Sequence, residues 1–131
     1  LCSPHNPIGR VWTKEELLKL AEICLENNVF IISDEIHFDL IMPGFEHVSM
    51  GTFEEKYLNN CAICTAPSKT FNLAGLQTSN IFIANEEYRN KMTSARGYFS
   101  LNIFGYKACE LAYDECEEWL EELLLFHRNL I

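Results

Sequence analysis

Three groups of polar side chains stand directly after short apolar runs, and their types could do chemistry. Asn6 follows the run at the start of the chain, Asp34 follows residues 29–32, and Ser68-Lys69 follows residues 61–65. Such runs predict strands, and ligands gather beyond the carboxyl ends of parallel strands in open α/β sheets. One such group is weak evidence, because an Asp often caps a helix and a loop Lys is usually solvated. Three groups in register, each after a strand, indicate a single site.

Lys69 and Asp34 suggest the chemistry of that site. Lys69 has no basic neighbour in the sequence and is flanked by Pro67-Ser68 and Thr70-Phe71. A lysine in a partly apolar cleft loses its proton more readily, so its neutral amine can act as a nucleophile or a base. A lysine that forms a Schiff base and an aspartate that pairs with a pyridinium are the groups that pyridoxal phosphate (PLP) requires of a protein. The sequence therefore predicts that Lys69 and Asp34 face one cleft.

Three segments that contain these residues resemble the landmark motifs of fold-type I, class I and II aminotransferases, in the family's order and approximate spacing. They are His5-Asn6-Pro7-Ile8-Gly9-Arg10, Ser33-Asp34-Glu35-Ile36-His37 and Ser68-Lys69-Thr70-Phe71-Asn72-Leu73-Ala74-Gly75-Leu76-Gln77. Residues 6–12, 34–37 and 119–123 are most similar to the MalY/PatB-type cystathionine β-lyase branch, whose members are C–S lyases. The resemblance covers essentially the whole chain.

The resemblance implies a role for each matching residue. Lys69 would hold PLP covalently and later abstract the Cα proton of the substrate. Asp34 would pair with the pyridine nitrogen and keep it protonated. Asn6 would hydrogen-bond the phenolic oxygen of the cofactor, next to a candidate cis peptide bond before Pro7. Ser68 would help to hold the phosphate, which suits backbone N–H groups in a turn.

Two positions depart from the family pattern. His37 stands where many aminotransferases have Tyr, and it can still donate a hydrogen bond to the phenolic oxygen. Gln77 stands where many relatives have an Arg that clamps the phosphate. Because Gln carries no charge, we expect Gln77 to be a weak cofactor contact, and phosphate binding must rely on other donors or on a partner chain.

Local signals predict the elements that would position these residues. Thr13 and Glu16 fit a capping box for a helix that stops at Asn27-Asn28. Further signals predict a short helix near 53–58, strands at 61–65 and 80–84, a helix over 86–96 capped by Asn85, and two C-terminal helices that break near Tyr113-Asp114. The run at 29–32 predicts a strand buried on both faces. Alternating strands and helices predict an α/β fold with a mostly parallel sheet flanked by helices, in three layers. The resemblance implies the large domain of a PLP-dependent transferase.

The charge, the apolar runs and the cysteine spacing each argue against a class of function. Ten basic and nineteen acidic residues give the 131-residue chain a net charge of −9, which argues against nucleic-acid binding. No apolar run approaches the roughly 18 residues of a membrane span. Cys61 and Cys64 have the spacing of a metal or redox pair, but they lie in an apolar run, so we expect reduced core thiols in a cytoplasmic protein and no metal site.

The length predicts a fragment. The chain opens without Met, and family members are much longer, so residues 1–131 are expected to be part of the large, PLP-binding domain. The N-terminal part of that domain and the C-terminal small domain would be absent. A fragment of this kind would be inactive alone and would expose apolar faces that favour self-association.

The resemblance implies α,β-elimination on a β-thio-substituted amino acid such as cystathionine. Transamination by the same residues is the alternative activity, and Lys69 and Asp34 cannot separate the two. A homodimer is expected for the full-length protein. The remaining alternative is an inactive fragment or a non-enzymatic interaction module.

Overall fold

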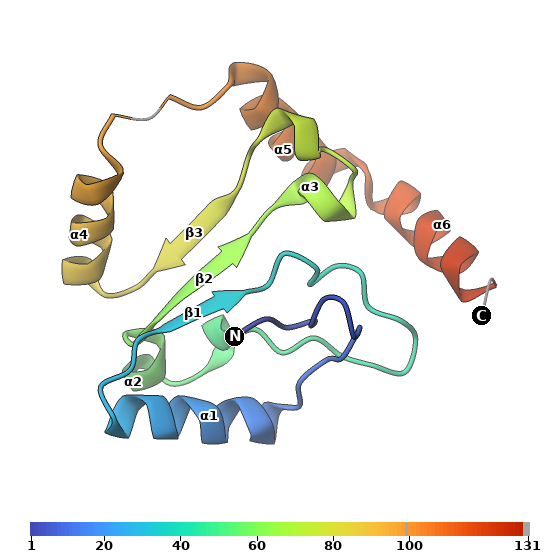
Figure 1. The fold of residues 1–131 in the computed structure, drawn as a ribbon. Coiled ribbons are helices and arrows are strands. Elements are labelled where there is room, and N and C mark those ends of the chain that lie inside the picture. Colours follow the sequence, from blue (N-terminus) through green and yellow to red (C-terminus); the bar gives the residue numbers. More distant parts are fainter. Residues whose placement is uncertain (99, 130–131) are drawn as a thin grey trace.

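A three-stranded sheet in the order β1-β2-β3 lies at the centre of the structure, a computed structural model that describes residues 1–98 and 100–129 (Figure 1). The strands are β1 (Ile31–Asp34), β2 (Cys61–Thr65) and β3 (Asn80–Ile83). The α-helices are α1 (Lys14–Glu26), α2 (Glu55–Leu58), α3 (Pro67–Thr70), α4 (Glu86–Arg96), α5 (Ile103–Glu115) and α6 (Glu117–Arg128), and the 3-10 turns are η1 (Met50–Thr52) and η2 (Ala74–Leu76). The predicted α/β class is confirmed.

Helix α1 begins with the predicted capping box. The Thr13 side chain accepts a hydrogen bond from the Glu16 N–H at 3.3 Å, and Glu16 accepts one from the Thr13 N–H at 3.0 Å. Each bond satisfies a backbone donor that the first helical turn would otherwise leave unpaired. The helix ends at Asn27, and the next residue, Asn28, takes a left-handed φ of 55° that turns the chain toward β1.

The sheet is mostly parallel, as predicted. β1 and β2 run parallel with Ile31 opposite Cys61, and residues 1–3 add a parallel bridge in which Cys2 lies opposite Asp34. β3 runs antiparallel to β2. The two strands are joined through the single turns α3 and η2 rather than through a long crossover helix, and a parallel return needs such a crossover. Periodicity identified this strand but could not reveal its direction.

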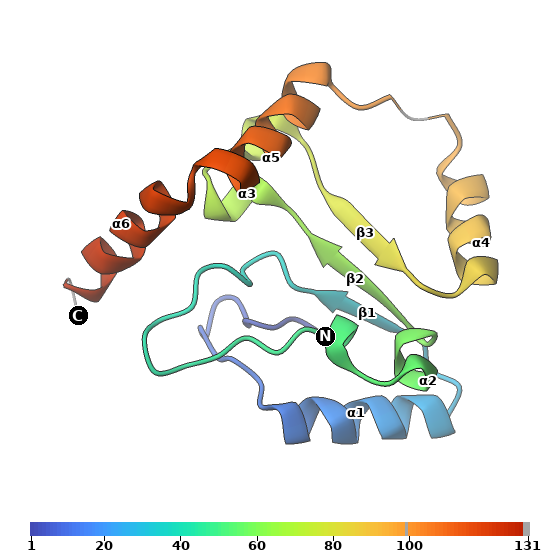
Figure 2. The same ribbon diagram turned by 180° about the vertical axis from the view of Figure 1, so that it is seen from behind.

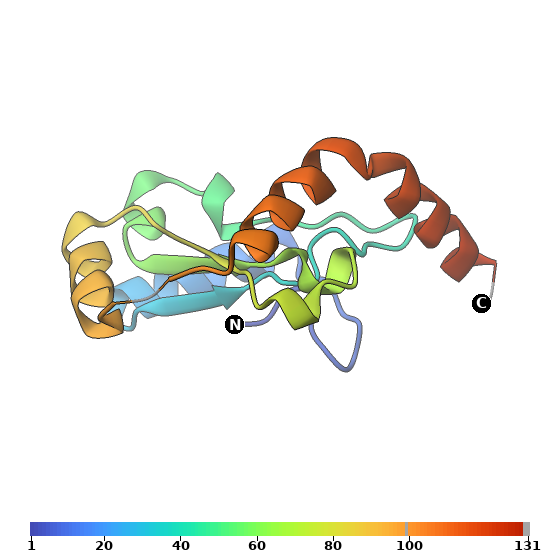
Figure 3. The ribbon, with the colours of Figure 1, turned by 90° about the horizontal axis from the view of Figure 1, so that it is seen from above.

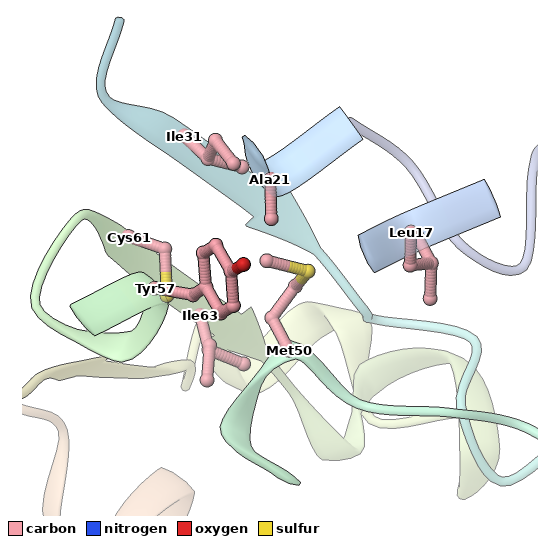
Figure 4. Packing of buried hydrophobic residues seen from close by; sticks show 7 residues of the cluster. All are labelled: Leu17, Ala21, Ile31, Met50, Tyr57, Cys61 and Ile63. Atoms are coloured by element: carbon pink, nitrogen blue, oxygen red, sulfur yellow. The ribbon is translucent and has the colours of Figure 1, made fainter. Parts of the chain in front are cut away.

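The core lies on one face of the sheet, where α1, η1 and α2 cover β1 and β2. Its buried members, shown in Figure 4, are Leu17, Ala21, Ile31, Met50, Tyr57, Cys61 and Ile63. The strand register places Ile31 beside Cys61 on that face, because opposite residues of neighbouring strands point the same way. The sheet, α1 and α2 thus form the packed part of the chain.

One sequence prediction about packing was wrong. The run at 29–32 was expected to be buried on both faces, but Val29 is 50% exposed and Ile32 is 61% exposed, because the described helices bury only the opposite face of β1. The two predicted C-terminal helices are present, and the break between them lies at Cys116, close to the predicted position. None of the side chains on α6 is buried.

Views from behind and from above show α5 and α6 extending beyond the end of the sheet that carries α3 (Figures 2 and 3). Within residues 1–98 and 100–129, no helix is both long and apolar enough to cross a membrane.

Candidate functional site

The three predicted groups of site residues lie after segments that run in the same direction. Cys2 lies opposite Asp34, and Asp34 lies opposite Cys64, so the three parallel segments are in register. Asn6 comes four residues after Cys2. Helix α3, which carries Ser68 and Lys69, starts three residues after Cys64. The carboxyl ends of these segments therefore meet at one edge of the sheet, as the spacing predicts.

Asn6 and His37 line one pocket of about 300 Å³. Apolar side chains supply much of the wall, with Val11, Leu40, Met42 and Phe45 among them. His5 lines the same pocket, and its ring Nδ1 is buried without a hydrogen-bond partner among the described residues. The Asn6–Pro7 peptide bond is cis, which confirms the prediction. The pocket thus joins an amide and two imidazoles from segments 31 residues apart.

Asp34 ends β1 with its side chain exposed, and its Oδ1 accepts a hydrogen bond from the Ile36 N–H at 3.2 Å. Burial raises the pKa of the Cys64 thiol, and the negative charges of Asp34 and Glu35 add to that shift. Asp34 therefore offers an exposed carboxylate at the edge where Asn6 and His37 lie. Its neighbour Glu35, in contrast, is buried.

Lys69 lies on α3, a single turn that starts at Pro67. Pro67 and Thr70 are buried and hold the turn against the rest of the chain, Ser68 is half-buried, and Lys69 is exposed. Within the part of the chain that the structure describes, Lys69 makes no hydrogen bond or ion pair. Because Lys69 is exposed, the described residues do not form the partly apolar cleft that was predicted around it.

Gln77 lies apart from the pocket that contains Asn6 and His37. It lines a separate hollow of about 280 Å³ together with Arg89 and Arg96, and it adopts a left-handed φ of 54°. Its weak contact with a cofactor stays a prediction.

A buried hydrogen-bond network beside the site was missed in the sequence. Glu35 accepts from the Ser33 hydroxyl at 2.9 Å and from the Met50 N–H at 3.0 Å, and it pairs with His47 Nε2 at 3.0 Å. Burial alone would raise the pKa of Glu35, but hydrogen bonds led by those from His47 and Ser49 outweigh it and hold the pKa below the usual value. His47 thus helps to fix the loop before η1.

The cysteine pair behaves as packed thiols. Cys61 is buried in the core, and burial raises the pKa of its thiol to about 11. A protonated thiol is a poor metal ligand and a poor nucleophile. Among the described residues, no cluster of three or more His, Cys, Asp or Glu side chains could hold a metal ion.

Residues 1–124 match the family model described as aminotransferase class I and II. The chain is 44% identical over 129 residues to cystathionine beta-lyase PatB of Bacillus subtilis, covering 96% of this chain and 33% of that protein. The structure superposes on cystalysin from Treponema denticola, a structure that contains a PLP cofactor, with a TM-score of 0.90, 48% identity, and coverage of 94% and 32%. It also superposes on the PLP-bound C-S lyase from Staphylococcus hominis, with a TM-score of 0.87, 35% identity, and coverage of 98% and 33%.

The chain thus spans about a third of the length of the relatives that it matches. The family model covers nearly all of it, including every residue of the candidate site. This chain belongs to the class I and II aminotransferase family.

Proposed function

We propose that these residues are the lysine-bearing part of a PLP-dependent C–S lyase that performs α,β-elimination on β-thio-substituted amino acids such as cystathionine. The observation that carries the proposal is the parallel register from Cys2 through Asp34 to Cys64, which brings the segments of Asn6, Asp34 and Lys69 to one edge. Similarity to a cystathionine β-lyase and to C–S lyase structures supports this activity over others in the family.

The donors at this edge fit PLP, an aromatic heterocycle with an aldehyde, a phenolic oxygen and a phosphate. The amine of Lys69 makes no hydrogen bond or ion pair with the described residues, and it can bond the aldehyde carbon. The exposed carboxylate of Asp34 suits a protonated ring nitrogen. Asn6 and His37 offer hydrogen-bond donors in one pocket. The buried Nδ1 of His5 in the same pocket has no hydrogen-bond partner among the described residues, so a polar group of a ligand could bind it.

Each residue has a defined task in the proposed reaction. PLP, when bound, supplies the electron sink that makes the Cα–H bond of an amino acid acidic. Asp34 keeps the proton on the ring nitrogen, and Lys69 moves the Cα proton as the general base. Asn6 and His37 orient the ring through its phenolic oxygen, and Ser68 contributes to holding the phosphate, with Gln77 as a weaker contact.

The proposal extends to the whole protein. Residues 1–131 correspond to part of the large cofactor domain, and the full-length enzyme acts as a cytoplasmic homodimer on a small amino-acid substrate. The remaining two thirds of the relatives' length would supply the groups that bind the substrate carboxylate. We therefore expect no turnover from the 131-residue chain alone.

The first experiment asks whether Lys69 is the reactive amine. The chain is mixed with less than one equivalent of PLP, reduced with borohydride, and digested for mass mapping of the pyridoxylated lysine. We expect Lys69 to be labelled about tenfold more than Lys14, an exposed lysine of α1 that serves as the internal control, because PLP held at the proposed site keeps its aldehyde beside one amine. Equal labelling of the two would favour the inert fragment.

The second experiment separates the lyase from the alternative activity, transamination. The full-length protein is supplied with cystathionine and no keto acid. Formation of pyruvate supports the lyase, whereas a strict requirement for a keto-acid acceptor supports the aminotransferase. Lys69→Ala should abolish turnover and leave PLP bound without a covalent bond, and rates near those of the unsubstituted enzyme would contradict the assignment of Lys69.

A further inference from the structure

A second polar network joins the turn after β1 to the turn that carries Lys69. The Thr70 hydroxyl, completely buried on α3, donates a hydrogen bond of 2.8 Å to Oδ2 of Asp39. The Tyr113 side chain from α5 lies beside the same carboxylate and interacts with it electrostatically. Three segments far apart in the sequence therefore meet at one half-buried carboxylate.

This carboxylate sits between residues of the proposed site. Asp39 comes two residues after His37, in a turn closed by backbone hydrogen bonds from Phe38 to Glu35 and from Leu40 to His37. Thr70 is the direct neighbour of Lys69. The bond between Asp39 and Thr70 thus connects the segment that holds His37 with the segment that holds the reactive amine.

The surroundings of Asp39 make this connection costly to break. Burial raises the pKa of Asp39. The hydrogen bond from Thr70 lowers this pKa in part, as do the nearby side chains of His47 and Tyr113. A partly desolvated carboxylate depends on its remaining hydrogen bonds, and bonds to a charged acceptor are stronger than neutral ones. On the other side of α3, the Phe71 ring packs edge-on against Tyr113 with ring centroids 5.3 Å apart. Tyr113 therefore supports both Asp39 and α3.

We propose that Asp39 is a positioning residue that fixes the turn carrying Lys69 by accepting the hydrogen bond from Thr70. Among the described residues, no hydrogen bond or ion pair holds the Lys69 side chain, so its direction depends on the backbone of α3. This inference rests on the proposed function for its consequence in cofactor binding, but its structural part can be measured without PLP.

The first test measures amide hydrogen exchange at Phe71 and Leu73, whose N–H groups bond the carbonyls of Pro67 and Ser68 and so report on the α3 turn. Thr70→Val removes the hydroxyl at nearly constant volume, and Thr70→Ser keeps it. We expect exchange at these amides to be about tenfold faster in Thr70→Val and near the unsubstituted rate in Thr70→Ser. Equal exchange in the two variants would overturn the proposal.

The second test repeats the labelling of Lys69 against Lys14 in folded samples. Thr70→Val and Asp39→Asn should lose about tenfold of the preference for Lys69, while Thr70→Ser retains it. Asp114→Asn, which removes an exposed carboxylate of α5, is the matched charge control and should change nothing. A residue with a purely structural role would lower the unfolding temperature and leave this preference intact.

The two outcomes are separable. If the unsubstituted chain shows no preference for Lys69, the proposed function fails while the exchange data still decide the role of Asp39. If the preference is present and survives in Thr70→Val, the positioning role is wrong and the proposed function stands. If Asp39→Asn does not fold, the comparison of Thr70→Val with Thr70→Ser decides.

Discussion

The two halves of the chain differ sharply in how they are packed. The part from residue 1 to β2 contains the whole buried cluster, in which α1, η1 and α2 lie against the sheet. After β3, the described residues bury only Gly105 and Ala112, although Ile103, Phe104, Tyr106 and Phe126 stand exposed there. Both halves are rich in apolar side chains, so composition does not explain the difference. The first half has elements to pack against, and the second half lacks them.

This difference has a consequence for function. Asn6, Asp34 and Lys69 all belong to the packed half or to its border, where the backbone is held by strand pairing and core contacts. The α4–α6 half contacts the rest of the chain through Tyr113 and Gly105 of α5, which meet Phe71 and η2, and through Tyr88 of α4, whose ring centroid lies 4.5 Å from that of Phe30. We infer that the site edge keeps its geometry even when the C-terminal helices move, provided that the contacts around α3 remain.

The largest expected effect contrasts a buried leucine with an exposed one. Leu17→Ala empties a completely buried position of α1 and should lower the free energy of unfolding by about 3–4 kcal/mol. Leu125→Ala, on α6 with 57% of the side chain exposed, should change it by less than about 0.5 kcal/mol. Urea unfolding followed by circular dichroism measures both. Similar losses would show that α6 packs against the sheet in solution and would break the comparison.

The next effect concerns the carboxylate of Glu35 and depends on pH. Its folded pKa lies below its usual value of 4.5, so the unfolded chain binds the proton more readily. Glu35 therefore stabilises the fold above pH 4.5, and this contribution is lost as the pH falls through the folded pKa. Asp39 works in the opposite direction, because its raised pKa adds stability as the pH falls.

Glu35→Gln should cost about 2 kcal/mol at pH 7 and flatten the decline in stability below pH 4.5. Urea unfolding over a pH series gives both quantities. An unchanged acid limb in the variant would mean that other carboxylates dominate acid unfolding.

Local signals explain which parts of this molecule could be predicted from the sequence. The capping box at Thr13, the strand at Cys61–Thr65 and the Asn85 cap of α4 each depend on residues a few positions apart, and all three are confirmed. The apolar runs before Asn6, Asp34 and Lys69 predicted parallel segments, and the register of residues 2, 34 and 64 shows that these segments run in the same direction.

The remaining features depend on residues distant in sequence. Glu35 and His47 are 12 residues apart, and Asp39 and Thr70 are 31 apart, so no periodic pattern connects them. Asp39 offered one signal, as a lone acid between Phe38 and Leu40 in an otherwise apolar stretch. The exposure of one face of β1 could not be predicted either, because a continuous apolar run does not indicate which face of a strand is covered.

A smaller effect is expected where α5, in the second half, approaches η2 through Gly105. A Cβ at Gly105 would meet the Thr78 hydroxyl and lie 2.7 Å from the Leu76 carbonyl oxygen, so α5 approaches η2 through this glycine. Gly105→Ala should weaken the docking of α5, raising amide exchange in α5 about tenfold, despite the about 1 kcal/mol that alanine gains in a helix. Gly75→Ala, where a Cβ meets nothing within 4 Å, is the control. Slower exchange in Gly105→Ala would mean that α5 does not dock this way.

The smallest effect compares two helix caps of the same type in the two halves. Thr13 accepts from the Glu16 N–H at the start of α1, and Asn102 accepts from the Phe104 N–H at the start of α5. Each substitution by Ala removes a cap worth about 1 kcal/mol. Because α1 is part of the core, Thr13→Ala should lower the global free energy of unfolding by that amount. Asn102→Ala should leave the global value unchanged and speed amide exchange only in the first turn of α5, since that helix can fray without exposing the core. Equal global losses from the two substitutions would show that both halves unfold as one cooperative unit.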